Sequence, residues 1–253
     1  MSRSDVIRIV PLHRPETEIA PAQAAPAPAP NLVYNGGPLL TAVEVFTIFW
    51  GSAWQQSPQS DLIPQINQFF TDILTSPLID QLGEYSVQGQ TIGYGSLIGT
   101  LTLTSQDPGA TVADADIQQL LQQEIANDPS IAQPDANTLY FFYLPPGVTV
   151  EMDGSASCQA FCGYHDTING QLFYAVMPYP DCSGCIASLS DPFDALTGTS
   201  SHELCESITD PIPGQGWYDN TNGEIGDICA WQFKQLDGYN IQLEWSNQAG
   251  SCL

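Results

Sequence analysis

The segment His202-Glu203-Leu204-Cys205-Glu206 combines residue types that bind and activate a metal ion. In a helix, His202 and Glu206 project from the same face one turn apart, and Glu203 lies beside them. This is the spacing of the H-E-x-x-H motif of zinc peptidases, with glutamate in place of the second histidine. Because a carboxylate oxygen is an accepted zinc ligand, we predict that His202 and Glu206 hold zinc and that Glu203 is the general base.

A third ligand is expected from the segment that follows the motif, where Glu224 and Asp227 are the main candidates. His165 and Asp210 are additional candidates, although a lone histidine is often only a hydrogen-bonded loop residue. A strand at 172–177, then the motif helix, then an irregular segment with the third ligand is the layout of zincin peptidases. An exposed edge strand, for which we choose 172–177, would bind an extended peptide by β-addition.

Other interpretations of these residues stay open. The oxygen-rich side chains after the motif also fit a calcium loop or a set of turns; these are Asp210, Asp219, Asn220, Asn222 and Asp227. Glu203 or Glu206 could pair with Glu224 in an acid peptidase. A further alternative is a non-catalytic extracellular binding or signalling protein, associated with carbohydrate or the cell wall, that uses exposed tryptophans.

All seven cysteines lie in the last 100 residues, at 158, 162, 182, 185, 205, 229 and 252. Their clustering in a Gly-, Asn- and Pro-rich region predicts disulfides and an extracellular location, although no recognisable signal peptide is present. A four-thiolate zinc site at 158, 162, 182 and 185 is the alternative. The odd count leaves one thiol, and we predict that it is Cys205, buried inside the helix.

The charge of the chain is one-sided, with 28 acidic and 4 basic residues. Three of the four, Arg3, Arg8 and Arg14, precede position 15, and Lys234 is the only basic residue after it. Nucleic acid and anionic membranes are therefore excluded as partners. Because few positive charges remain when the carboxylates are protonated, we expect tolerance of an acidic exterior. Lineage bias in composition is the alternative.

The chain divides into a disordered N-terminal segment with a Pro/Ala linker at 1–30 and a single globular domain at 31–253. Strands are expected at 39–50, within 85–103, on both sides of the Pro-Pro-Gly turn in 138–152, at 171–177 and at 239–245. Helices are expected from 61 to before Pro77, at 114–127 and at 199–208. This order predicts a mixed α+β fold of zincin type, with a disulfide-rich C-terminal half. We expect a monomer that acts on a peptide or protein substrate.

Several segments resemble a known family. They are the runs at 35–40 and 48–51, the cysteine motifs at 158–165 and 182–185, and the blocks SHELCESITDP, GWYDN, GEIGDIC and LEWSN. Together they are similar to the secreted plant phosphate-induced (exordium-like) proteins and to their bacterial and fungal relatives that carry an H-E-x-x-E motif. The resemblance covers 31–253 in segments and implies an extracellular, disulfide-bonded protein.

Overall fold

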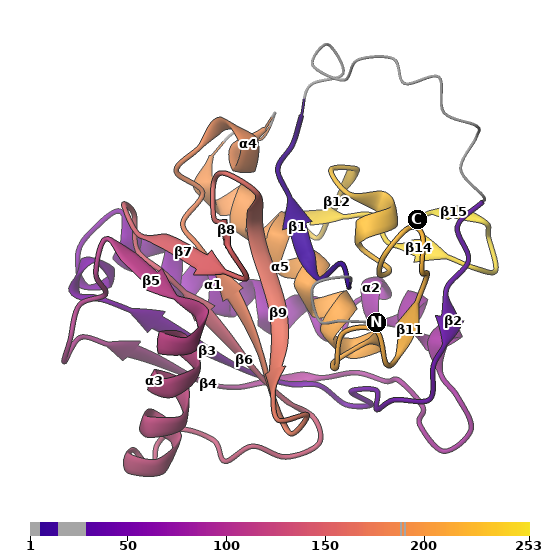
Figure 1. Ribbon diagram of the computed structural model, residues 1–253, viewed down its shortest axis with the longest axis horizontal. Helices are drawn as coiled ribbons and strands as arrows, with labels where there is room; N and C mark the ends of the chain where they lie inside the picture. Colours follow the sequence, from indigo (N-terminus) through magenta and orange to yellow (C-terminus); the bar gives the residue numbers. More distant parts are fainter. Residues whose placement is uncertain (1–5, 15–28, 188, 190) are drawn as a thin grey trace.

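A mixed sheet of six strands forms the centre of the computed structural model, which describes residues 6–14, 29–187, 189 and 191–253 (Figure 1). The strands lie in the order β1 (Ile9–Pro11), β9 (Phe161–Ile168), β10 (Leu172–Met177), β6 (Thr138–Tyr143), β3 (Glu44–Trp50) and β4 (Ser96–Leu103). The last four run parallel to one another. β9 is antiparallel to β10, and β1 is antiparallel to β9.

Both faces of this sheet are buried, which explains why its central strands are continuously apolar rather than alternating. In β6, Leu139 and Phe141 face a core shared with α1 (Gln59–Ile73), α2 (Pro77–Leu82) and α5 (Pro192–Thr209). Tyr140 and Phe142 face a second core on the opposite side. That core is closed by α3 (Asp114–Asn127) and the small sheet β5-β7-β8 (Thr111–Ala113, Thr149–Met152 and Ser155–Ala156).

Short elements, most of them from the C-terminal part of the chain, pack around α5. They are α4 (Ser183–Ile186), η5 (Asp227–Cys229) and the strand pairs β2–β11 (Val33–Tyr34 with Trp217–Tyr218), β12–β13 (Phe233–Leu236 with Tyr239–Gln242) and β14–β15 (Trp245–Ser246 with Ser251–Cys252). Two further 3₁₀ turns, η3 (Ser52–Gln55) and η4 (Gly83–Tyr85), complete the described elements. The mixed α+β class expected from the sequence is confirmed.

The predicted motif helix is present and longer than expected. α5 begins at Pro192, whose ring suits the first helical position, and the side chain of Asp191 caps it by accepting from the backbone N–H of Asp194. The helix at 114–127 and the two strands within 138–152 are also confirmed. The helix expected from 61 begins at Gln59 and ends at Ile73, and a separate helix starts at Pro77.

Two expectations are corrected by the sheet order. The strand at 172–177 is not an exposed edge, because β10 is paired on one side with β9 and on the other with β6. Residues 9–11 are not part of a disordered tail, because they pair with β9 in the main sheet. The folded body therefore includes a described N-terminal segment before position 31, while 15–28 lie outside the described residues.

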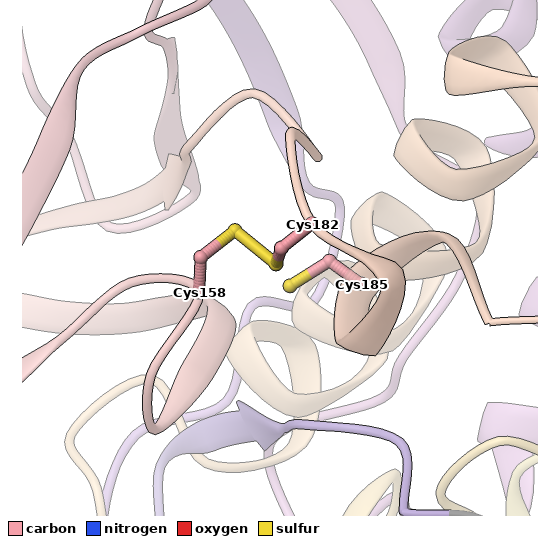
Figure 2. Close-up of side chains that lie close together, drawn as sticks. All are labelled: Cys158, Cys182 and Cys185. Carbon is pink, nitrogen blue, oxygen red and sulfur yellow. A yellow bond between two sulfur atoms is a disulfide. The ribbon is translucent and has the colours of Figure 1, made fainter.

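Three disulfides join Cys158 to Cys182, Cys162 to Cys185 and Cys229 to Cys252, as the clustering predicted. Figure 2 shows the first bridge with Cys185 beside it. The four cysteines of the alternative zinc site are all bonded in disulfides, so the four-thiolate zinc alternative is wrong. Cys205 is the free cysteine and is buried, as expected. Among the described residues, no helix is long and apolar enough to cross a membrane.

Candidate metal centre

α5 crosses the core as a helix buried on all sides from Ala195 to Thr209. A helix surrounded by protein normally carries apolar residues on every face, and charged side chains in it require partners. His202, Glu203 and Glu206 have no exposed surface. The polar motif therefore lies inside the protein, where its charges must be compensated by one another, by protons or by an ion.

The predicted residues of the motif and of the following segment meet around Glu206. Nε2 of His202 lies 2.9 Å from Oε1 of Glu206. The backbone N–H of Asp227 donates to the same oxygen at 3.1 Å. Ligand atoms of His202, Glu206 and Asp227 come within 4.8 Å of one another, which is close enough for one cation. Of the two main candidates for the third ligand, Glu224 and Asp227, Asp227 is thus the one that lies with His202 and Glu206.

The ring of His202 is the least satisfied group in this set. Neither of its nitrogens makes a hydrogen bond of acceptable geometry, despite complete burial. Oε2 of Glu206 and Oδ1 of Asp227 are also buried without a hydrogen-bond partner. Buried polar atoms are nearly always hydrogen-bonded. Nitrogen and oxygen atoms that lack hydrogen bonds on three neighbouring side chains therefore fit the binding of a cation.

His165 lies on β9 opposite α5 rather than in a loop. Its Nδ1 is 3.0 Å from Oε2 of Glu203 and 3.5 Å from Oε2 of Glu206. Its Nε2 is 3.3 Å from the backbone carbonyl of Asp210 and 3.5 Å from Oε1 of Glu224. His165, Glu203 and Glu206 thus form a second, overlapping set of ligand types. Both ring nitrogens of His165 have hydrogen-bond partners, whereas the polar contact of the His202 ring is the one between Nε2 and Glu206.

Asp210 is brought close to the site but is used for another purpose. Its carboxylate accepts from the backbone N–H groups of Gly214, Gln215 and Gly216, which fixes the turn after α5. Glu224 is placed near His165 rather than near His202, and both of its oxygens lack hydrogen-bond partners. Of the candidate third ligands, Asp227 is therefore the one that joins His202 and Glu206.

The alternative calcium loop at 219–227 receives less support. The carboxylate of Asp219 accepts from the backbone N–H groups of Asn31, Thr221 and Asn222. These bonds identify Asp219 as a turn former, whose oxygens are engaged by donors. Within the segment 219–227, Asp227 lies in η5, and this element places it beside Glu206 of α5.

The pKa values of the clustered side chains are shifted because several carboxylates are buried close to one another. Burial raises the pKa of Glu224, and the nearby carboxylates of Glu206 and Asp210 raise it further. Burial would lower the pKa of His202, but the carboxylates of Glu206 and Glu203 outweigh it and raise that pKa. Burial and the charge of Glu206 also raise the pKa of Asp227. A divalent cation would relieve this excess of negative charge and displace the protons.

Two contributors were missed by the sequence analysis. Gly226 lies against His202, and a Cβ there would come within 2.8 Å of the imidazole ring. Glu244, at the end of the C-terminal apolar run, is fully buried beside the cluster with both carboxylate oxygens unpaired. In the alternating pattern of 239–245, a glutamate between two apolar residues is expected to face solvent, so the local pattern carried no signal of its burial.

No family model matches this chain, and no curated protein is similar to it. Comparison with solved structures finds a chain described as "Structure of a chaperone-substrate complex", with 12% sequence identity and a TM-score of 0.28. The match covers 74% of this chain and 26% of that one. A likeness of this size carries no argument about fold or function.

Proposed function

We propose that this protein is a secreted metal-dependent hydrolase that acts on peptides, with zinc as the metal. The observation that carries the proposal is the convergence of His202, Glu206 and Asp227, whose ligand atoms lie within 4.8 Å of one another and include buried atoms without a hydrogen-bond partner. Two nitrogen or oxygen ligands from one helical turn and a third from a following segment match catalytic zinc sites. The three disulfides support an oxidising, extracellular location.

Glu203 is the residue placed to move a proton. Its Oε2 is held by Nδ1 of His165 at 3.0 Å, whereas its Oε1 has no hydrogen-bond partner. One oxygen is thus fixed and the other is free to accept a proton from an attacking water, as a general base requires. His165 orients this carboxylate. A bound zinc ion supplies Lewis-acid activation of the reacting groups.

The first test is metal content. Purified protein should hold about one zinc per chain after dialysis, and His202→Ala should hold none. His13→Ala is the matched control, because His13 is a half-buried histidine that packs against Trp231 outside the cluster and its loss should leave zinc unchanged. Calcium that is retained by His202→Ala would contradict the zinc site and favour the loop at 219–227.

The second test separates catalysis from metal binding. Glu203→Gln should keep the zinc but lower peptide hydrolysis by about 10²- to 10⁴-fold, the usual contribution of a general base. Hydrolysis is measured on a mixture of unstructured peptides with mass spectrometric detection. Unchanged turnover in Glu203→Gln would contradict the assigned role.

A second candidate function is favoured by one observation, the complete burial of His202 and Glu206. Structural metal sites are closed, so the same ligands would suit an extracellular binding or signalling domain stabilised by the ion. In that case zinc removal lowers the melting temperature while no peptide is hydrolysed by the loaded protein. Membership of the phosphate-induced family is likewise a proposal, which rests on the sequence motifs.

A further inference from the structure

Residues 6–14, called here the N-terminal segment, run along the outer side of β9 (Figure 1). Ile9 pairs with Tyr164, and Val10 pairs with Gly163, in antiparallel register. β9 is the strand that carries His165 and the one whose outer edge would otherwise be unpaired. Exposed sheet edges accept extended peptides through main-chain hydrogen bonds. The N-terminal segment therefore occupies the place where such a peptide would lie.

Side chains at alternate positions attach this segment to the body. Arg8 is 5% exposed and forms ion pairs with Asp153 and, at 3.5 Å, with Asp166. Val10 is 2% exposed and packs with the Cys162–Cys185 bridge. Leu12 belongs to the same cluster and contacts the backbone position of Gly184. The edge of β9 thus offers an acidic site followed by an apolar surface built on disulfides.

The same segment covers the metal centre. The backbone N–H of Ile7 donates to the Tyr218 hydroxyl at 3.0 Å, and the indole N–H of Trp231 donates to the carbonyl of Pro11 at 2.9 Å. β1 also contacts α5 and η5, the two elements that carry the proposed ligands. Glu203 has no exposed surface with the segment in this position.

Glu203 faces the strand to which the segment is paired. A Cβ placed on Gly163 would lie 3.4 Å from Oε1 of Glu203, the oxygen without a hydrogen-bond partner. Gly163 is the direct partner of Val10 across the strand pair. The absence of a side chain at 163 brings the backbone of β9 close to the proposed base. A peptide in the place of Val10 would be held next to the same strand position.

We propose that the outer edge of β9 is the docking site for an extended peptide substrate and that the N-terminal segment occupies this site in the intact chain. The peptide that fits has a basic residue, a β-branched residue two positions later and leucine two positions after that, as in Arg8, Val10 and Leu12. This inference rests on the proposed function, because it names how the substrate binds and what closes the site.

The experiment uses the full chain with a recognition sequence for a site-specific protease in place of residues 20–26, within the Pro/Ala stretch. The protein is cut, and a fluorescently labelled peptide with the sequence of residues 6–14 is added. Fluorescence anisotropy should show binding to the cut protein and at least tenfold weaker binding to the uncut protein. Zinc-free samples serve equally well, so this readout does not depend on turnover.

Variant peptides test the recognition pattern. Replacement of the arginine or the valine by alanine should weaken binding by about tenfold, since each side chain is buried in the intact chain. The matched control is the Ile7→Ala peptide, because Ile7 is 39% exposed and its side chain should contribute little. Equal affinities for the unchanged peptide and its three alanine variants would overturn the assigned recognition pattern.

The outcomes separate this inference from the proposed function. Hydrolysis of peptides that appears only after cutting, and is inhibited by the added segment peptide, supports both. Peptide binding without hydrolysis supports the docking site and counts against the hydrolase. If the segment stays bound and does not exchange, or if the cut protein loses its circular dichroism when the segment leaves, β1 is a permanent strand and the inference is wrong.

Discussion

Gly226 shows how little room the ring of His202 has. The glycine backbone fills the space beside the imidazole, and any Cβ would approach three of its ring atoms within 2.9 Å. Its backbone is in the ordinary helical region, with φ of −79°. The reason for glycine here is therefore close packing rather than backbone conformation.

We predict that Gly226→Ala displaces the His202 ring. Overpacking of this kind costs about 1–3 kcal/mol in the free energy of unfolding, and the displaced ligand should weaken zinc binding by tenfold or more. Urea denaturation and zinc competition with a chromophoric chelator measure the two effects. Gly83→Ala is the control, because its Cβ would meet no atom within 4 Å. Equal zinc affinity in both variants would contradict the packing argument.

At the scale of elements, η5 places Asp227 beside α5. The last residue of η5 is linked by a disulfide to the C-terminal strand. Cys229 ends η5 and is bonded to Cys252 in β15. The other two bridges join β9 and the turn before it to α4 and its N-cap, away from the ligands. The bridges are similar in sequence separation, which makes them comparable in their effect on the unfolded chain.

We predict that the double variant Cys229→Ser/Cys252→Ser loses zinc affinity, whereas Cys158→Ser/Cys182→Ser does not. Each pair of substitutions should lower the free energy of unfolding by about 2–4 kcal/mol. Only the first releases the element that carries Asp227, so its dissociation constant for zinc should rise by about 10- to 100-fold. Isothermal titration calorimetry provides the comparison. Similar zinc affinities in the two variants would show that η5 is held without its disulfide.

The proposed ligands were accessible to sequence reasoning because their arrangement is mostly local. The spacing of His202 and Glu206 places both on one helix face, and Asp227 follows within a short, turn-rich segment. The choice of Asp227 over Glu224 was not local, because it depends on how η5 packs against α5. Glu244 was missed for the same reason, since it comes from a C-terminal segment that folds back onto the helix.

The order of the strands in the sheet was the feature of the fold that the sequence predicted least well. β9 and β10 are both buried along their whole length and adjacent in sequence, and nothing in either segment shows that both are paired on two sides within the sheet. The N-terminal strand was equally hidden. Arg8 interrupts an apolar run, which is typical of an unstructured leader, but in the fold it pairs with acids contributed by residues more than 140 positions away. Such long-range ion pairs have no signature in the local sequence.

At the scale of the whole molecule, the buried acids affect how stability depends on pH. Burial raises the pKa of Glu244, as it does those of Glu203 and Glu224. A carboxyl with a raised pKa in the folded state holds its proton more tightly than in the unfolded chain. In the metal-free protein, its contribution to stability is therefore present below the unfolded pKa and is lost as the pH rises toward the folded value.

We predict that Glu244→Gln makes the metal-free protein less sensitive to rising pH. Between about pH 4.5 and 7, the wild type should lose stability relative to the variant, by about 1–3 kcal/mol at the upper end. Urea denaturation in the presence of a chelator measures the difference. Glu151→Gln is the control, because Glu151 is exposed. A constant difference across this range would show that Glu244 does not titrate differently in the fold.

Cys205 has a consequence for how long the covalent framework lasts outside a cell. Disulfides rearrange when a thiolate attacks one of their sulfurs, and a free thiol in the same chain is the nearest source of that nucleophile. The Cys205 thiol has no exposed surface, and burial together with nearby acids raises its pKa. The odd cysteine is thereby kept protonated and out of reach, so the folded chain carries no internal catalyst for scrambling its own three bridges.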